Sequence, residues 1–339
     1  MARLLATFAT ALLACACALP GPALAARKTY FRVGNAVDAA AVTTAGTVLM
    51  GGSTDVDEAF RWLCDRATGG DFLVVRATGT DAYNPYVQAL CPGLNSVATL
   101  IISSAKAANV QSVREAIANA EVVWIAGGDQ SDYITEWTGT AVQDALNAHI
   151  AAGKPIGGTS AGLAVLTQFV YSALGSQGIT SAEALADPFN RYNTFARDFV
   201  YVASLQGAIG DTHFAARDRM GRTISFLCRV YANGWSAMPR AIAVSEETAL
   251  LIDARGVGKV VGTNNAYFIQ APGMPEVCSP GLPLTYRNVA VRRVGAGDSF
   301  NVTDWKGSAG TKYTVTAETG VLSSSQPGGS VYLGIGVWG

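Results

Sequence analysis

The sequence predicts an α/β fold in which helices sandwich a doubly wound, largely parallel sheet. Three observations support this prediction. Short apolar runs alternate with helix-like stretches between residues 47 and 158, which is the pattern of consecutive strand–helix–strand units. Half of the residues are hydrophobic and only 14% are charged, as expected for a chain with a large core. Two glycine-rich segments directly follow apolar runs, where parallel sheets place their ligand-binding loops.

The expected strands of this region are short apolar runs bounded by glycine, aspartate or asparagine. They are residues 47–50, 72–75, 97–102, 122–126 and 155–158. The stretches between them have helical patterns, at residues 56–67, 84–90, 112–120 and 139–152. Because strands and helices alternate, we expect the strands to lie parallel in one sheet.

The second half of the chain is less regular. Two more helices are expected, at residues 161–171 and 213–231, with a polar loop at 172–193. Short strands follow at residues 241–244, 249–253 and 259–262. After about Pro280 the sequence changes to β-type segments separated by glycine and serine, at residues 288–293, 312–317 and 330–337. We therefore expect a main α/β domain over residues 27–279 and a small β-rich C-terminal extension over residues 280–339.

The first 26 residues have the features of a secretory signal peptide. Arg3 precedes an apolar run over residues 4–19, and Ala23-Leu24-Ala25 matches an A-x-A cleavage site. No second stretch of about 20 apolar residues follows, so an integral membrane protein is not expected. We expect the mature protein to be secreted or periplasmic. A lipoprotein is the weaker alternative, because the segment before Cys15 is a poor lipobox.

The cysteines, histidines and charges limit the possible chemistry. Without the leader the chain keeps Cys64, Cys91, Cys228 and Cys278, which allows one or two disulfides in an oxidising compartment, with three possible connectivities. There is no Cys-x-x-Cys pair and there are only two histidines, so we expect no metal and no cofactor. The 24 basic and 25 acidic residues nearly balance, which predicts no general attraction to nucleic acid or membranes.

The segment Gly-Gly-Thr-Ser-Ala-Gly-Leu at residues 157–163 joins an expected strand to an expected helix. Ser160 lies between glycines at this turn and fits the Gly-x-Ser-x-Gly pattern of a nucleophile elbow. Such a turn exposes the hydroxyl and leaves nearby backbone N–H groups free to stabilise an oxyanion. We expect these donors to be Ala161 and either Gly128 or Asp129, which follow the preceding strand. The alternative is a tight turn with an incidental serine.

A serine nucleophile needs a base, and histidine is the usual one near neutral pH. His149 ends an expected helix, where a structural role is the better interpretation. His213 begins another expected helix beside three arginines, and we take it as the candidate base. The order of residues leaves the acid of a triad open among four carboxylates: Glu183, Asp187, Asp198 and Asp211.

Three segments together resemble the cyanophycinase family of serine peptidases, which is related to aspartyl dipeptidase. They are Gly127–Gln130, Gly158–Gly162 and His213-Phe214-x-x-Arg217-x-Arg219-x-x-Arg222. The resemblance covers about residues 47–262 and implies a fold similar to class I glutamine amidotransferases. The leader and the segment Asp81-Ala82-Tyr83-Asn84-Pro85-Tyr86 look most like the secreted branch of this family.

The resemblance also implies roles for individual residues. Ser160 would be the nucleophile, His213 its base and Glu183, which precedes Asp187-Pro188, the orienting acid; for Glu183 a solvated helix-start residue is an equal alternative. The implied substrate-binding residues are Gln130, Asp211, Thr212, Arg217, Arg219 and Arg222. Thr212 departs from the family, which has glutamine there, so substrate preference could differ. The arginines could instead form a solvated helix face or pair with carboxylates such as Asp218.

Cyanophycin is a poly-aspartate chain with arginine attached to each side-chain carboxyl group. The resemblance implies a secreted exopeptidase that hydrolyses this polymer to β-Asp-Arg dipeptides through an acyl-enzyme. Two alternatives stay open: a related aspartyl or isoaspartyl peptidase with another substrate, and a non-catalytic binding protein of the same fold. A homodimer is a further expectation from the family.

Overall fold

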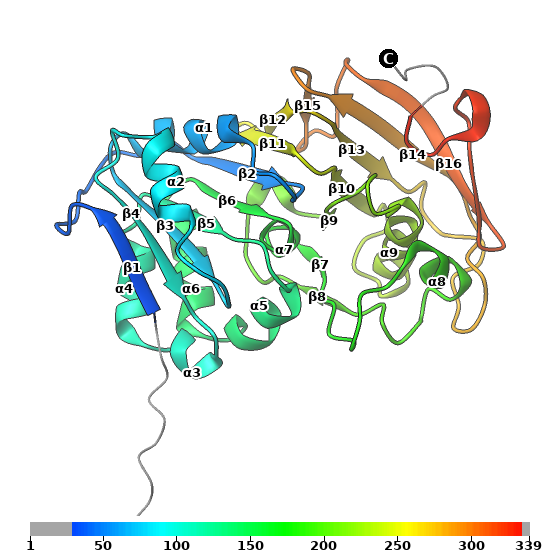
Figure 1. Cartoon of the computed structure of the whole chain (residues 1–339). Coiled ribbons are helices and arrows are strands. Elements are labelled where there is room, and N and C mark those ends of the chain that lie inside the picture. Colours follow the sequence, from blue (N-terminus) through cyan, green and yellow to red (C-terminus); the bar gives the residue numbers. More distant parts are fainter. Residues whose placement is uncertain (1–28, 334–339) are drawn as a thin grey trace, which may run out of the picture.

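The computed structural model describes residues 29–333, and the predicted signal peptide lies outside the described residues. Two β-sheets stand next to each other, the first at the left and the second at the right of Figure 1, and helices pack against both. The architecture is a mixed α/β fold with a strand-rich C-terminal region, which confirms the predicted fold class.

The first sheet has nine strands in the order β1-β4-β3-β5-β6-β2-β11-β12-β15. Their bounds are β1 Thr29–Gly34, β2 Gly46–Met50, β3 Asp71–Arg76, β4 Ser96–Ile101, β5 Val122–Ile125, β6 Ile156–Thr159, β11 Thr248–Asp253, β12 Val257–Gly262 and β15 Ser299–Asn301. The strands from β4 to β2 are parallel, and the outer strands pair antiparallel. The five strands predicted between residues 47 and 158 are these five parallel strands.

Helices cover both faces of the first sheet because successive side chains of a strand point to opposite faces. Val48 and Met50 of β2 belong to the core formed with α1 and α2, whereas Leu49 belongs to the core formed with α4 and α6. The bounds of the helices in this half are α1 Asp57–Ala67, α2 Tyr83–Leu90, α3 Ala105–Ala108, α4 Gln111–Asn119, α5 Gln130–Trp137 and α6 Ala141–Ala151. The sequence patterns predict α1, α2, α4 and α6, but they do not predict α3 or α5.

The second sheet has eight strands in the order β17-β16-β14-β13-β10-β9-β7-β8. Their bounds are β7 Phe169–Tyr171, β8 Phe195–Arg197, β9 Ala208–Asp211, β10 Arg240–Val244, β13 Asn265–Gln270, β14 Tyr286–Gly295, β16 Thr311–Glu318 and β17 Val321–Ser324. The strands β7, β9 and β10 are parallel. One face packs against α8 (Ser181–Ala186) and α9 (Met220–Ala232). The short connection from β10 to β11 joins the two sheets.

Three predicted elements differ from the structure. The apolar residues 161–171 are not one helix: a single turn, α7 (Ala161–Ala164), is followed by the strand β7, and both elements are buried. The helix expected from residue 213 begins only at Met220, because His213 and Asp218 have positive φ angles. Residues 330–333 form no strand, and the rest of the strand expected at 330–337 lies outside the described residues.

The C-terminal strands are built into both sheets. The strand β15 pairs with β12 of the first sheet, and β14 pairs with β13 of the second. The chain then returns to α9, where the Tyr332 hydroxyl accepts a hydrogen bond from the N–H of Met220 at 2.9 Å and donates one to Asp218 at 2.8 Å. Its ring packs edge-on against Phe214. The C-terminal segment thus supports the turn at residues 213–219, while the boundary at residue 280 stays a prediction.

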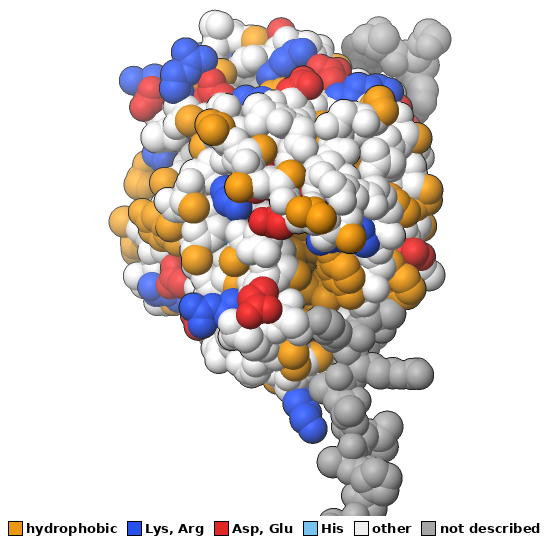
Figure 2. Space-filling view, turned by 90° about the vertical axis from the view of Figure 1, so that its left-hand side faces the viewer, with side chains coloured by type: hydrophobic (Ala, Val, Ile, Leu, Met, Phe, Trp, Pro, Cys, Tyr) orange, Lys and Arg blue, Asp and Glu red, His pale blue; other side chains and the backbone are white. Residues whose placement is uncertain are grey.

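The surface on the β1 side of the molecule is mixed. Small groups of hydrophobic side chains alternate there with lysine, arginine, aspartate and glutamate (Figure 2). Within residues 29–333, no helix has the length and apolar character needed to cross a bilayer.

Two disulfides connect the four cysteines of the described chain. Cys64 of α1 is bonded to Cys91, which follows α2, and Cys228 of α9 is bonded to Cys278. The bonds close loops of 27 and 50 residues. Each bond therefore limits the freedom of the unfolded chain.

Removing the second disulfide should destabilise the protein measurably. We expect the Cys228→Ala/Cys278→Ala variant to lose about 2–4 kcal/mol of unfolding free energy, because the unfolded chain gains the freedom of the opened loop. Guanidinium unfolding followed by fluorescence measures this loss. The Cys64→Ala/Cys91→Ala variant is the matched control for the shorter loop. If a reductant does not change the unfolding midpoint of the wild-type protein, the pairing is contradicted.

Candidate active site

Ser160 lies at the turn between β6 and α7. Its φ of +53° and ψ of −116° form a conformation that residues with side chains rarely adopt, at a cost on the order of 1–3 kcal/mol. The flanking glycines let α7 approach the sheet closely. A Cβ on Gly158 would lie 2.5 Å from the carbonyl carbon of Gly162, and a Cβ on Gly162 would overlap the carbonyl oxygen of Ile125. The Gly-x-Ser-x-Gly pattern is therefore a packing requirement of this turn.

His213 lies two residues beyond the end of β9 and faces the serine. Its Nε2 atom is 2.9 Å from the Ser160 Oγ, although the two residues are 53 positions apart. The His213 side chain is almost fully buried, whereas Ser160 is partly exposed. The structure therefore brings the predicted nucleophile and the predicted base into hydrogen-bond contact.

Glu246 completes a chain of three side chains. It lies in the short connection between β10 and β11, and its Oε1 is 2.6 Å from the Nδ1 atom of His213. A carboxylate at Nδ1 favours the tautomer in which Nδ1 carries the proton and Nε2 accepts one from Ser160. Since β9 and β10 are parallel neighbours, His213 and Glu246 follow adjacent strand ends, where parallel sheets collect functional groups.

Glu183 does not take this place, which corrects the expectation for the acid. It lies in the first turn of α8 and forms a capping box with Thr180. The Glu183 carboxylate accepts hydrogen bonds from the Thr180 N–H at 2.9 Å and from the Thr180 hydroxyl at 2.7 Å. Its oxygens therefore satisfy a helix terminus, and His213 takes its carboxylate partner from a segment later in the chain.

The end of β2 holds the backbone of all three segments. The Met50 carbonyl accepts a hydrogen bond from the N–H of Ser160 at 3.0 Å. The Gly51 carbonyl accepts one from the N–H of His213 at 2.8 Å, and the Gly52 carbonyl accepts one from the N–H of Glu247 at 3.0 Å. Three consecutive carbonyl groups thus align the two predicted residues and the neighbour of Glu246. The residues that follow β2 thus contact segments at the strand ends of the second sheet.

The electrostatic surroundings favour the neutral form of His213. Burial lowers the pKa of His213, and the nearby Arg217 and Arg219 lower it further. The hydrogen bond from the ring to Glu246 raises it, and the net pKa lies below the ordinary 6.5. A neutral imidazole is able to accept a proton from a serine hydroxyl. The other histidine, His149, is buried at the end of α6 with its Nε2 3.0 Å from the Pro155 carbonyl, which agrees with a structural role.

The expected oxyanion donors lie around the same turn. A Cβ on Gly127 would lie 3.5 Å from the Ser160 Cβ, so the loop after β5 runs beside the serine. Asp129 caps α5 by accepting a hydrogen bond from the Ser131 N–H at 2.9 Å. Ala161 is the first residue of α7, and the first N–H groups of a helix have no intrahelical acceptor. The donors assigned to Ala161 and to Gly128 or Asp129 stay a prediction.

Asp211 and Arg222 form a buried ion pair, which corrects their expected role in substrate binding. Arg222 is bonded to both carboxylate oxygens of Asp211, at 2.9 Å through Nε and also through Nη2, and Thr223 donates to the same carboxylate. Burial alone would raise the pKa of Asp211, but Arg222 holds that pKa below its usual value. Both residues are about 95% or more buried, so they anchor α9 to the end of β9 and do not face a ligand.

Thr212 is also buried and accepts hydrogen bonds from the side chain of Arg219. Its carbonyl and hydroxyl oxygens both accept hydrogen bonds from Nη1 of Arg219, at 2.9 and 3.0 Å. Direct substrate contact by Thr212 is therefore not supported, and its effect on the site passes through Arg219. Burial lowers the pKa of Arg219 to about 10, which leaves this residue a cation at neutral pH.

Two of the predicted substrate-binding residues are accessible. Half of the Arg217 side chain is exposed, and its Nε is 3.6 Å from the Glu246 Oε1. Gln130 is partly exposed and donates to the Tyr171 carbonyl at 3.3 Å. Arg217 thus lies beside Glu246 and Gln130 beside β7. Both side chains can contact carboxylate or amide groups of a ligand.

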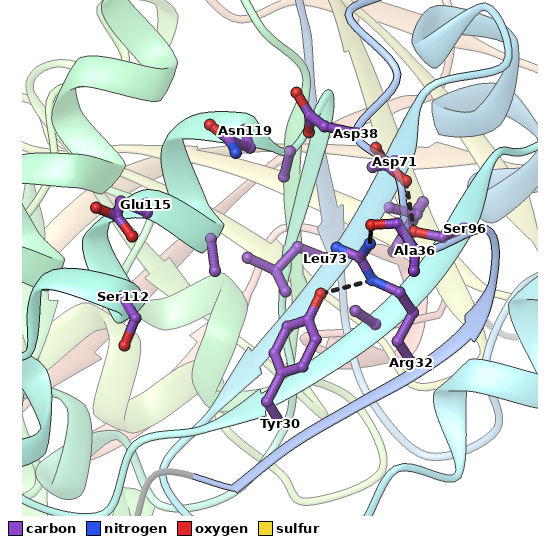
Figure 3. Close-up of a pocket in the computed structure, with 14 residues that line it drawn as sticks. Tyr30, Arg32, Ala36, Asp38, Asp71, Leu73, Ser96, Ser112, Glu115 and Asn119 are labelled. Atoms are coloured by element: carbon purple, nitrogen blue, oxygen red, sulfur yellow. Dashed lines mark hydrogen bonds between the residues drawn. The ribbon is translucent and has the colours of Figure 1, made fainter.

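A cavity of about 380 Å³ lies elsewhere, at the amino ends of β3 and β4. Figure 3 shows that its polar groups bond to one another: Arg32 donates to the Tyr30 hydroxyl and the Ala36 carbonyl, and Ser96 donates to Asp71. Parallel sheets bind ligands at the opposite, carboxyl edge. This cavity is therefore a weaker candidate for the functional site than the surroundings of Ser160.

The sequence-based reasoning misses Glu246 and the glycine pair Gly51 and Gly52. Glu246 follows the apolar strand at 241–244 within Ser245-Glu246-Glu247. A serine–acid–histidine order considers only carboxylates that precede His213, and Glu246 follows it. The rule that functional groups follow strand ends would have found both sites, since the glycine pair also follows a predicted strand.

Comparisons with known proteins find one matching family model and two similar solved structures. Residues 44–185, which include Ser160, match the model of peptidase family S51. The structure is similar to a peptidase from an acI-B1 Actinobacterium, with a TM-score of 0.52 and 15% identity over 77% of this chain and 98% of that chain. A candidate peptidase E from Listeria monocytogenes EGD-e gives a TM-score of 0.42 and 16% identity over 64% of this chain and 96% of that chain. A search of the curated proteins finds no match.

The titration of His213 should report its surroundings. In an NMR titration of histidine-labelled protein, we expect His213 to have a pKa below 6.5 and His149 a pKa of about 4, because both rings are buried. Glu246→Gln should lower the pKa of His213 further, since the carboxylate favours the protonated ring. The control Glu183→Gln should leave it unchanged, and a rise in the Glu246→Gln variant would contradict the contact.

Proposed function

We propose that the chain is a serine peptidase of family S51, whose model matches residues 44–185, and that Ser160, His213 and Glu246 form its catalytic triad. The observation that carries the proposal is the continuous contact from Ser160 Oγ to His213 Nε2 at 2.9 Å and from His213 Nδ1 to Glu246 at 2.6 Å. A nucleophile bonded to a base that is itself held by a third group is the general arrangement for activating a serine.

The reaction follows from these contacts. Ser160 Oγ attacks the scissile carbonyl carbon while His213 Nε2 takes the hydroxyl proton, and Glu246 stabilises the imidazolium that forms. The oxyanion is stabilised by the N–H groups of Ala161 and of Gly128 or Asp129. The tetrahedral intermediate expels the amine, which receives the proton from His213 and leaves an acyl-enzyme. Water then attacks the ester carbonyl while His213 takes its proton. The second tetrahedral intermediate collapses to the carboxylic acid product, and His213 returns the proton to the Ser160 Oγ.

For the substrate we propose cyanophycin, cleaved to β-Asp-Arg dipeptides. The support is the resemblance of three segments to cyanophycinases and the presence of Arg217 beside the triad, because each arginine of the polymer carries a free carboxylate that a guanidinium can bind bidentately. The departure at Thr212 and the structural use of Asp211 and Arg222 favour keeping a second candidate, a related aspartyl or isoaspartyl peptidase. The intact serine–histidine contact argues against a non-catalytic binding protein.

We also propose that the protein works outside the cytoplasm. The support is the predicted leader, together with the two disulfides, Cys64–Cys91 and Cys228–Cys278, which persist in oxidising compartments.

The substrate proposal is tested by digestion of insoluble cyanophycin. We expect mature wild-type protein to clear the suspension and release β-Asp-Arg, and Ser160→Ala to lose this activity by about 10³-fold or more, because the acyl-enzyme cannot form. Short aspartyl and isoaspartyl peptides are assayed beside the polymer. Cleavage of the peptides alone would favour the second candidate, and equal activity of wild type and Ser160→Ala would reject the triad.

The identity of the acid is tested by two matched glutamates. We expect Glu246→Gln to reduce kcat by about 10²- to 10⁴-fold, because the amide neither fixes the productive tautomer nor stabilises the imidazolium. Glu183→Gln should retain kcat, since Glu183 only caps α8. Steady-state kinetics on the best substrate measure both, and the reverse ranking would restore Glu183 as the acid.

A further inference from the structure

The ring of His213 rests directly on Gly52. A Cβ built on Gly52 would overlap Cε1 of the ring and would lie 2.5 Å from Nε2 and 3.1 Å from Nδ1. Gly52 also has a φ of +105°, which residues with side chains rarely adopt. The absence of a side chain at this position therefore creates the space that the imidazole occupies.

The ring cannot move away without losing a partner. Its Nε2 contacts Ser160 and its Nδ1 contacts Glu246, so it is fixed at both ends. Ordinary van der Waals contact begins at 3.4 Å, and the step from 2.5 to 3.4 Å requires a shift of about 0.9 Å. A shift of this size lengthens at least one of the two hydrogen bonds beyond a useful range.

The backbone carbonyls of Gly51 and Gly52 also hold the segments that carry His213 and Glu246. The Gly51 carbonyl accepts from the His213 N–H, and the Gly52 carbonyl accepts from the N–H of Glu247, which follows Glu246. A Cβ on Gly51 would overlap the carbonyl oxygen of Ser245. The glycine pair is therefore in contact with both segments that carry the base and the acid.

We infer that Gly52 is a positioning residue of the peptidase: its bare Cα sets the place of the His213 ring, and its carbonyl sets the place of the loop that carries Glu246. The inference rests on the proposed triad and adds a residue that touches neither substrate nor the attacking oxygen. It acts through His213, so its effect must depend on the presence of the imidazole.

The first test compares two glycine-to-alanine variants. Gly52→Ala should lower kcat by about 10²-fold with little change in KM, because misplacement of a catalytic group by about 1 Å has an effect of this size. It should also slow labelling of Ser160 by a fluorophosphonate. The matched control is Gly139→Ala, which has a positive φ of +71° but open space around its Cβ position, and which should retain kcat and the labelling rate.

The second test is a double-mutant cycle with His213→Ala. If Gly52 acts through the ring, Gly52→Ala has no further effect on the residual activity of His213→Ala. If Gly52→Ala folds poorly, its folding is compared in the background without the imidazole. When Gly52→Ala/His213→Ala folds as well as His213→Ala, the clash with the ring is the cause of the folding defect. Equal losses of activity in both backgrounds, equal losses of folding in both, or full activity of Gly52→Ala would overturn the inference.

These outcomes are separate from a failure of the proposed triad. The triad fails if Ser160→Ala or His213→Ala retains wild-type activity. The positioning role fails alone if both residues are required and Gly52→Ala remains fully active.

Discussion

The end of β2 is the constraint on which the rest of the site depends. Three consecutive carbonyl groups, of the last residue Met50 and of the two glycines that follow it, each accept a hydrogen bond. The donors are the backbone N–H groups of Ser160, His213 and Glu247. The serine comes from the first sheet and the other two segments come from strand ends of the second. The relative position of the two sheets therefore determines the contact between Ser160 and His213, at 2.9 Å. The contact between His213 and Glu246, at 2.6 Å, joins neighbouring strand ends of the second sheet.

Rigid packing around this point stabilises conformations that would otherwise be unfavourable. Ser160 and His213 both have positive φ angles, and each is held by packing that leaves no room to relax. For the serine, this packing is the contact of α7 with β5 that Gly162 permits. For the histidine, it is the buried pair Asp211–Arg222, which anchors the following helix. Asp211 and Arg222, which the sequence predicts to bind substrate, are thus part of the scaffold that positions His213.

The sequence predicts the parallel half of the fold well because buried strands and amphipathic helices leave distinct patterns. It fails at residues 161–171, where one turn of helix and a strand are both fully buried and so have the same apolar composition. The residues of the site likewise include some that the sequence identifies and one that it does not. Ser160 is identifiable from its Gly-x-Ser-x-Gly pattern, and His213 because the chain has only two histidines. Glu246 is one of 25 acidic residues, and its sequence position after a strand does not show that it contacts His213, because that contact depends on the pairing of β9 with β10. The spacing of Arg217, Arg219 and Arg222 does not show which guanidinium is buried, because Asp211, the carboxylate that binds Arg222, lies on another element.

The contact of Tyr332 with Asp218 and Phe214 has a consequence for biosynthesis. The turn that carries His213 receives part of its support from a residue 114 positions later than Asp218. A ribosome releases the chain from its N-terminus onwards, so a nascent chain already contains the serine, the histidine and Glu246 while it still lacks this support. The base receives this support only when Tyr332 has been made and has packed beside α9. Synthesis as far as Tyr332 thus precedes full assembly of the active site.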